Sequence, residues 1–320
     1  MNRTELGELL KEGLVESYSN LPKGKYITLV IEHVTESECI FRTEGSGEGL
    51  NKELVKMGLK IEKLDYRAII SKRKQSSVER RTGREILRDN DLLFKDSKQN
   101  LCELNKNSPC GKCLDCMLYG YAVGDGGAQK SRVIYDNAYS IRKFIDITDK
   151  KTFNALYENG TMRDEKGKPS SSINEDEYIK PNTIFLDMIT LKDITVDELI
   201  YILGCILRSK RYGALSSRIG KINNKLLNII VSDCEMFSNL ELTQGVYDKL
   251  SEQKILDNLT NDNIMKSVVY ETLEELSKGI YGSVHIINNV EEILNYIKEV
   301  FSNKGNLKEL LENQSKAYGE

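Results

Sequence analysis

Residues 183–191 alternate between apolar and other side chains, as expected of a β-strand. Ile184 and Leu186 fall on one face of this strand, and Phe185 and Ile189 fall on the other. Because both faces are apolar, we expect the strand to lie in the centre of a sheet.

A helix is predicted directly after this strand, because apolar residues recur at helical spacing over residues 199–206. Asp193 or Thr195 can cap it, and Asp197 and Glu198 suit the positive end of its dipole. Strand and helix therefore form one continuous unit.

The rest of the pattern is mixed. Residues 3–18 predict a helix, and residues 25–33 predict a strand paired with 38–43. Residues 50–100 are mainly helical and charged. From residue 268 the apolar spacing is helical again, and we expect these helices to pack on the core or, alternatively, on a neighbouring subunit.

Composition is that of a soluble globular protein, since 39% of the 320 residues are hydrophobic and 30% are charged. We find no apolar run long enough to cross a bilayer, and the N-terminus does not resemble a signal peptide. The sequence therefore predicts a cytoplasmic protein that does not enter a membrane.

Charge is distributed unevenly along the chain, although the formal net charge is only −3. Residues 67–88 hold eight Lys or Arg and two Glu, whereas residues 226–320 hold eight Lys and sixteen Asp or Glu. The last arginine is Arg218. Since arginine binds phosphate in a bidentate manner, we expect any RNA-binding surface in the first two-thirds of the chain.

Residues 204–225 follow the predicted helix and contain cations but no carboxylate. The cations are Arg208, Lys210, Arg211, Arg218, Lys221 and Lys225. Gly213 and Gly220 allow close approach of the main chain, so this segment can cradle a sugar-phosphate backbone. The alternative is a solvated helix end followed by an ordinary loop. The spacing does not fit a nucleotide-binding P-loop.

A second basic segment aligns arginines on one face of a helix, if Ser77 caps that helix. The aligned residues are Arg80, Arg84 and Arg88, with Arg81 beside them. Stacked guanidinium groups repel each other unless an anion lies between them, and RNA phosphate is such an anion. The alternative is a solvated face relieved by Glu79 and Glu85.

Four cysteines lie within fifteen residues, at Cys102, Cys110, Cys113 and Cys116. Four thiolates on a short loop favour structural zinc, while an iron–sulfur cluster and redox-active thiols are the alternatives. A zinc ion held by four protein ligands has no open position, so it would shape the loop and not activate water.

Nothing in the sequence indicates a catalytic centre. The two histidines, His33 and His285, do not belong to a nucleophile motif, and the common metalloprotease, hydrolase and dinucleotide motifs are missing from the sequence. We therefore expect a protein that is not an enzyme. A metal-cluster enzyme and a zinc-ribbon regulator of duplex DNA remain the competing hypotheses.

Several motifs resemble those of one known family. FLDMITLKDITVDEL at 185–199 and GALSSRIGKI at 213–222 resemble the closing strand, helix and glycine-rich loop of the RAMP superfamily. The segments CGKCLDCMLYGYAVGDGG at 110–127, FNALYENGTM at 153–162 and DCEMFSNLELTQ at 233–244 resemble the guide-RNA-binding backbone subunit of the type I-D CRISPR interference complex, Cascade.

The resemblance implies an α+β fold with a split RNA-recognition-type, ferredoxin-like core. In this interpretation residues 1–60 and 182–250 form the core, and 61–101 form a basic helical insertion. Residues 102–118 form a zinc-binding loop, 119–181 form a glycine loop and a thumb hairpin, and 251–320 form a C-terminal helical region. Met162 in the thumb is a candidate wedge between bases, although an ordinary exposed turn fits the sequence equally well.

The resemblance further implies binding of guide RNA regardless of its sequence, pairing of that guide with target DNA, and assembly with further copies of the chain and with the large subunit. The candidate RNA contacts are Lys72, Arg73, Lys74, Arg80, Arg81, Arg84, Arg88, Lys130, Arg132, Arg208, Lys210, Arg211, Tyr212, Gly213, Arg218, Gly220 and Lys221. Lys130 and Arg132 are included because they follow the glycine-rich segment 120–127, for which a plain turn is the alternative.

Overall fold

A computed structural model describes residues 1–42, 49–104, 106, 108–123, 127–154, 156–169, 173–213, 220–256 and 262–318. The helices are α1 (Arg3–Leu9), α2 (Lys72–Asp89), α3 (Leu114–Tyr119), α4 (Phe144–Ile147), α5 (Val196–Arg208), α6 (Asn239–Glu252), α7 (Asp262–Ser277), α8 (Glu291–Ser302) and α9 (Lys304–Ala317). The strands are β1 (Tyr26–Thr35), β2 (Lys52–Lys56), β3 (Leu64–Ile70), β4 (Tyr121–Val123), β5 (Gly127–Gln129), β6 (Val133–Tyr135), β7 (Ala138–Ser140), β8 (Thr148–Asn154), β9 (Ile173–Ile179), β10 (Ile184–Lys192), β11 (Arg211–Tyr212), β12 (Gly220–Ser232) and β13 (Val284–Ile287).

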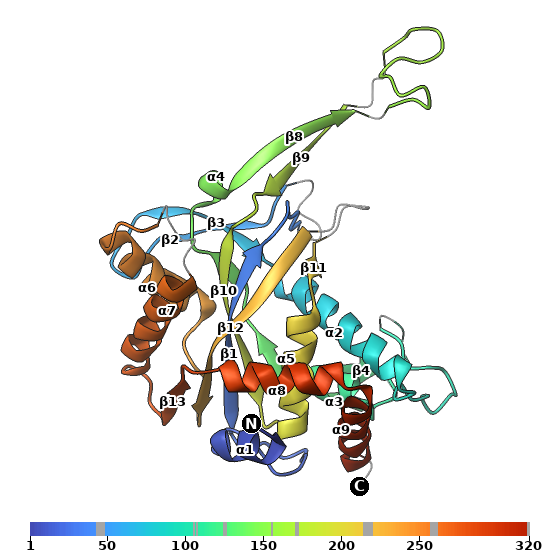
Figure 1. Cartoon of the computed structure of the whole chain (residues 1–320), viewed down its shortest axis with the longest axis vertical. Helices are drawn as coiled ribbons and strands as arrows, with labels where there is room; N and C mark the ends of the chain where they lie inside the picture. The colour runs from blue at the N-terminus through green and yellow to red at the C-terminus, as the bar shows by residue number, and fades with distance from the viewer. Residues whose placement is uncertain are drawn as a thin grey trace.

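The main sheet is antiparallel, with strand order β11-β12-β1-β10-β7-β3-β2, and β13 pairs with β12 while β6 pairs with β10. Strand β1 lies between β10 and β12 and is antiparallel to both. The chain thus leaves β10, forms α5 and returns as β12 on the far side of β1 (Figure 1). The expected strands at 25–33 and 183–191 are confirmed, and the expected mixed α+β class is correct.

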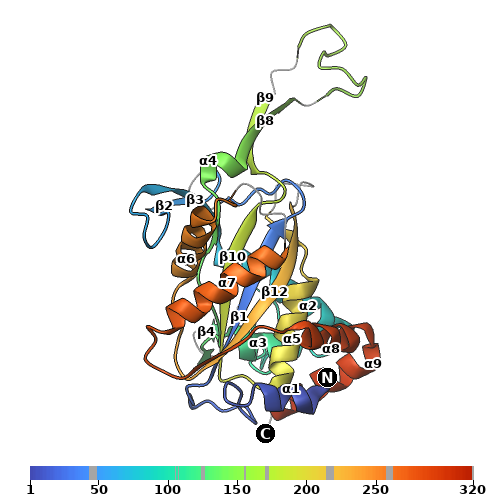
Figure 2. The same ribbon diagram turned by 60° about the vertical axis from the view of Figure 1, so that its left-hand side comes forward.

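Helices cover both faces of this sheet (Figures 1 and 2). On one face α2, α5, α8 and α9 pack on apolar residues of the central strands, including Ile189 and Leu191 of β10. On the other face α6 and α7 pack on Leu186 and Met188 of the same strand. The alternation read from the sequence therefore matches two separate apolar cores, and β10 is buried on both sides as predicted.

Helix α5 begins where its capping residues predict. The Thr195 side chain accepts a hydrogen bond from the Glu198 amide, and the Glu198 carboxylate accepts one from the Thr195 amide, which forms a capping box. This cap fixes the direction of α5 across the sheet. It leaves Arg208 at the last turn, next to β11.

Other elements differ from the sequence prediction. The helix expected at 3–18 ends at Leu9. Of the strand expected at 38–43, the described residues 38–42 do not pair with β1; Cys39 pairs instead with Ile179. Within 50–100 the chain forms the β2–β3 hairpin before α2. A strand, β13, interrupts the C-terminal helices and extends the main sheet.

The β2–β3 hairpin was not predicted from the sequence, because its charged residues are not typical of a buried strand. Arg67 of β3 is fully buried, and its guanidinium donates to the main-chain oxygens of Met57, Ser140 and Ile141. Carbonyl oxygens replace water around this cation, which is how a charged residue can lie inside a sheet. Residues 61–101, assigned to a helical insertion, therefore contribute strand β3 to the sheet.

Strands β8 and β9 form a separate hairpin that projects away from the sheet (Figure 1). Its base is attached through the pairing of Cys39 with Ile179 and through an ion pair between Arg42 and Asp176. This hairpin lies within residues 119–181, where the thumb hairpin is expected. Among the described residues, we find no helix of the length and apolarity that crossing a membrane requires.

Candidate metal centre and nucleic-acid interface

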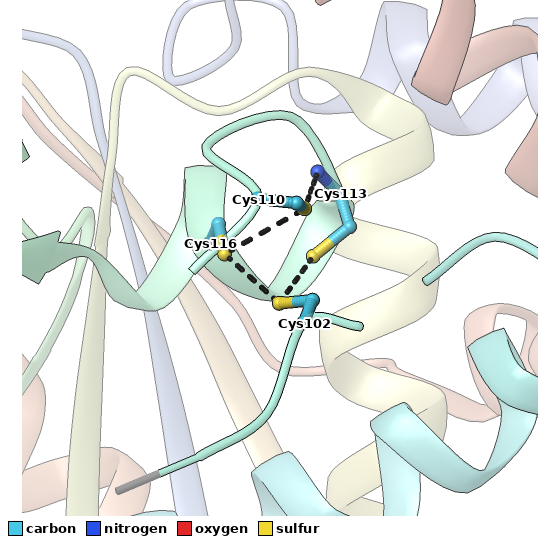
Figure 3. A group of neighbouring side chains, drawn as sticks. All are labelled: Cys102, Cys110, Cys113 and Cys116. Atoms are coloured by element: carbon cyan, nitrogen blue, oxygen red, sulfur yellow. Dashed lines mark hydrogen bonds between the residues drawn. The ribbon is translucent and has the colours of Figure 1, made fainter. Parts of the chain in front are cut away.

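The four clustered cysteines converge in space, as their spacing predicts (Figure 3). Gly111 has a positive φ of 68°, which turns the loop back, and α3 begins directly after Cys113. The four Sγ atoms all lie within 4.8 Å of one another. This group can hold a metal ion.

Sulfur separations in the cluster suit a shared ion and not a disulfide. The Sγ atom of Cys102 lies 3.9 Å from that of Cys113 and 3.6 Å from that of Cys116, whereas a disulfide bond is about 2.05 Å long. Hydrogen bonds shared among the four thiols hold the pKa values of Cys102 and Cys110 below the usual value and those of Cys113 and Cys116 above it. Cys102 and Cys110 are therefore the thiols that most readily become thiolates, the form that binds metals.

The arginine stripe on α2 is present, but its anion belongs to the protein. Arg80 Nε and Nη2 each donate to the Asp115 carboxylate at 2.9 Å, and Arg84 Nη1 donates to it at 2.8 Å. Asp115 is buried inside the cysteine motif. The aligned arginines do have an anion between them, as expected. At Arg84, whose side chain is buried, that anion is the Asp115 carboxylate, so the prediction of RNA phosphate was wrong there.

The start of α2 was also predicted in the wrong place. Its N-cap is Ser71, and the Ser77 hydroxyl donates to the main-chain oxygen of Arg73 inside the helix. Arg81 and Arg88 lie on the exposed side of α2, and together with Glu85 and Glu103 they line a cavity of about 330 Å³. These two arginines remain available to a ligand.

Lys72 and Tyr212 are buried and bind partners inside the protein, so neither is available to RNA. The Lys72 ammonium forms an ion pair with Asp187, and the Tyr212 hydroxyl accepts a hydrogen bond from Asn224 at 3.0 Å. His33 of β1 connects its two neighbouring strands, because its ring nitrogens contact Asn224 of β12 at 2.8 Å and Asp187 of β10 at 2.9 Å. A polar network thus fixes the first turn of α2 and β11 to the sheet.

Ionisation in this network is set by burial and by neighbouring charges. Burial opposes ionisation of Asp187, but the Lys72 ammonium and a hydrogen bond from His33 overcome it and hold the pKa of this carboxyl well below its usual range. Burial raises the pKa of Glu79, which accepts hydrogen bonds from Gln75 and Tyr135. Asp187 is therefore the ionised carboxylate on which the network depends.

Lys130 and Arg132 lie at the far end of the sheet from β11. Arg132 is buried, donates to the Glu198 carboxylate and to the Asp193 carbonyl, and lies over the Tyr18 ring. Strand β1 separates the two ends by about 30 Å at roughly 3.3 Å per residue. Arg132 is thus a structural residue, and Lys130, although exposed, does not join the other cations.

The remaining cations gather where β1 ends and β12 begins, which we call the hairpin end because the β8–β9 hairpin is attached there. They are Arg73, Lys74, Lys210, Arg211 and Lys221. Arg73, Arg211 and Lys221 are exposed, and Lys210 and Lys74 are half-buried. Gly213 has a φ of 73° and turns the chain beside Lys74. Gly220 packs against Cys39, leaving no space for a side chain.

Three further candidate residues lie outside this group. Arg218 falls outside the described residues. Arg208 is exposed at the end of α5, where it lines a cavity of about 440 Å³ with Glu85 and Asp89, and these carboxylates make that cavity less suitable for phosphate. Met162 lies on the projecting hairpin and is 54% exposed.

A sequence model of one protein family, described as Csc2 CRISPR, matches residues 13–311 and so covers most of the chain. The chain belongs to the Csc2 CRISPR family. Csc2 proteins are structural Cascade subunits and not known enzymes, in agreement with the expected absence of catalysis. No curated protein sequence matches the chain.

Solved structures agree with the family at the level of the fold. The crystal structure of Thermofilum pendens Csc2 is similar with a TM-score of 0.56 and 17% identity, and the match covers 95% of this chain and 99% of that one. A chain of a CRISPR RNA-guided surveillance complex, pre-nicking, is similar with a TM-score of 0.50 and 10% identity, covering 81% and 90%.

The site also contains residues that the sequence did not reveal. Asp115 holds two arginines, and Asp187 holds Lys72. The position of Asp115 inside the cysteine motif was a usable signal, because a carboxylate beside four thiols needs a nearby cation. Asp187 lies in an apolar strand, where a lone carboxylate indicates an unseen partner.

Proposed function

We propose that this Csc2 protein is the guide-RNA-binding backbone subunit of a type I-D CRISPR interference complex, Cascade. The observation that carries the proposal is the group of cations at the hairpin end: Arg73, Lys74, Lys210, Arg211 and Lys221. They lie near the base of the projecting hairpin, so an RNA strand bound by them would run past that base.

The strand order supports a core of the RNA-recognition type. Strands β10 and β12 flank β1 and are joined by α5, while β6 and β7 lie on the outer side of β10 after α2. Read as β1, α2, β6 with β7, β10, α5 and β12, this is the βαββαβ arrangement of a ferredoxin-like fold. Helices α6 and α7 cover the face that such folds often leave open.

Binding should not depend on the guide sequence. The hairpin-end cations are lysines and arginines suited to phosphate, and phosphate contacts position a strand without reading its bases. A protein that carries guides must accept every spacer, and the bases then remain free to pair with target DNA.

The β8–β9 hairpin is proposed to act as the thumb that reaches over the RNA held by a neighbouring copy. Its described tip exposes Leu156, Tyr157 and Met162, which are 63%, 42% and 54% exposed. Large apolar side chains on a projecting element favour contact with bases or with another subunit. Met162 is the proposed wedge between bases.

Zinc is the metal that we propose for the cysteine cluster. Four sulfur ligands at about 2.3 Å from a tetrahedral ion lie about 3.8 Å apart, and the sulfur pairs from Cys102 to Cys113, Cys102 to Cys116 and Cys110 to Cys116 are 3.9, 3.6 and 4.0 Å apart. Cysteine fills all four positions, so the ion would hold the loop and would not activate water.

Binding of the purified protein to unrelated single-stranded RNAs tests the proposal. We expect similar affinities for all of them, with a log-log salt slope that falls by roughly 0.7 for each phosphate contact removed. Arg211→Ala should lower affinity and slope, whereas Lys130→Ala at the far end of the sheet is the matched control and should change neither. Strict preference for one sequence, or for duplex DNA, would support a regulator instead.

A further inference from the structure

Arg84 connects helix α2 to the cysteine cluster through three contacts. Its Nη1 atom donates to the Asp115 carboxylate at 2.8 Å and to the Sγ atom of Cys102 at 3.6 Å, and its Nη2 atom donates to the Cys102 carbonyl. The side chain is only 5% exposed. One guanidinium therefore touches a candidate metal ligand both at its sulfur and at its main chain.

Arg80 completes this arrangement from the next turn of α2. It donates two hydrogen bonds to the Asp115 carboxylate, and its guanidinium carbon lies 5.3 Å from the centre of the Tyr119 ring, on the helix that carries Cys116. Asp115 is thus clamped between two arginines. Its position, two residues after Cys113 and one before Cys116, makes the clamp part of the cysteine loop.

Charge explains why arginines are needed here. A divalent ion with four thiolates carries a net charge of about −2, and burying that charge is costly unless cations lie nearby. Arg80 and Arg84 together exceed the charge of Asp115 by one positive charge. The excess lies against Cys102, the cysteine furthest from the others in the sequence and therefore the one that the loop constrains least.

We propose that Arg84 is a positioning residue for the metal centre: it orients the Cys102 thiolate toward the ion and offsets part of its charge, with Asp115 and Arg80 holding Arg84 in place. This inference rests on the proposed structural zinc. Hydrogen bonds to metal-bound ligands orient them and tune the metal, and their loss commonly weakens metal binding 10- to 100-fold.

The test compares Arg84→Met and Arg84→Lys with the matched control Arg88→Met. Arg88 is exposed on the same helix, one turn further on. Zinc affinity is measured by competition with a chromogenic chelator. We expect zinc affinity to fall at least tenfold in Arg84→Met and less in Arg84→Lys, because an ammonium keeps the charge but cannot contact Asp115 and Cys102 together. Arg88→Met should retain wild-type affinity.

Cobalt substitution provides a second readout, which a purely structural effect of Arg84 would not move. The sulfur-to-cobalt charge-transfer band reports the thiolates directly, so it should shift in both Arg84 variants and remain unchanged in Arg88→Met. Equal zinc affinity and equal cobalt spectra in Arg84→Met and Arg88→Met would overturn the inference. If Arg84→Met does not fold, the same comparison is decided by Arg84→Lys.

The wild-type protein separates this inference from the proposal beneath it. If wild-type protein binds one zinc ion and both Arg84 variants bind it equally well, only the role of Arg84 is wrong. If wild-type protein takes up neither zinc nor cobalt, the proposed metal itself is wrong.

Discussion

Two sets of cations in this protein come from similar basic segments of the sequence but differ in burial. Lys72, Arg84 and Arg132 are buried, and each forms an ion pair with a buried carboxylate: Asp187, Asp115 and Glu198 respectively. Arg73, Arg211 and Lys221, at the hairpin end, are exposed, and Lys221 forms its ion pair with the exposed Glu36. A basic segment therefore does not identify an RNA surface until the internal carboxylates have been matched to their partners.

The largest contrast is expected between two adjacent residues, Lys72 and Arg73. Lys72→Met leaves the buried Asp187 carboxylate without its strongest cation, so the free energy of unfolding should fall by about 3–5 kcal/mol. Arg73→Met should change it by less than about 0.5 kcal/mol while weakening RNA binding. Urea unfolding of both variants measures this contrast, and equal losses would contradict it.

The second expected effect is a loss of folding stability in acid, which acts on the buried Asp187. The pKa of Asp187 is lower in the folded state than in the unfolded chain, so its stabilising contribution is complete above the unfolded value near 4 and is lost as the pH falls below it. Glu79 opposes this, because its raised pKa favours the protonated folded form. We expect the urea midpoint to fall between about pH 4 and pH 2. Asp187→Asn should reduce that dependence, and an unchanged profile would argue against the network.

The exposed set should affect RNA binding more than stability, because an exposed ion pair such as that of Lys221 with Glu36 contributes little to folding. Replacing both Arg211 and Lys221 by alanine should weaken RNA binding about tenfold, or about 1.4 kcal/mol, and lower the salt slope by about 1.4 if each contacts one phosphate. Filter binding over a range of salt concentrations measures both. Lys130→Ala is the control, and a similar loss in this variant would show that charge acts without regard to position.

Met162→Ala should have the smallest effect on a single subunit. Because Met162 is 54% exposed, we expect a change in unfolding free energy below about 0.5 kcal/mol and an affinity for short RNA within twofold of wild type. On an RNA long enough for several copies, chemical probing should lose a regular pattern of unpaired bases. If wild-type protein produces no such pattern, the wedge role is wrong.

The sequence predicted the parts of the fold that depend on local patterns. The strand at β10, the helix α5 with its Thr195 cap and the cysteine cluster all follow from spacing within about fifteen residues. Local spacing did not predict the β2–β3 hairpin or the burial of Arg132, because both depend on partners far away in the sequence. Carbonyl oxygens of residues 140 and 141 accept from Arg67, and Glu198 accepts from Arg132.

The same limit explains the candidate site. Spacing placed Arg80 and Arg84 on one face of a helix, but it gave no information on which anion lies opposite, and Asp115 is more than thirty positions away. The remaining candidate RNA contacts differ in side-chain exposure, which only the folded structure reveals. Lys130 and Arg132 were grouped with the proposed RNA contacts because they follow the glycine-rich segment 120–127, although they lie at the opposite end of the sheet.

Helix α2 connects the cysteine cluster with the cations of the hairpin end. Its eighteen residues span about 27 Å, with Arg73 and Lys74 in the first turn and the Asp115 clamp at Arg80 and Arg84 beyond the middle. A tilt of a few degrees at the sulfur-rich end would displace the opposite tip by an ångström or more. Any movement of the cysteine loop that tilts α2 would therefore also move Arg73 and Lys74, two of the proposed phosphate contacts.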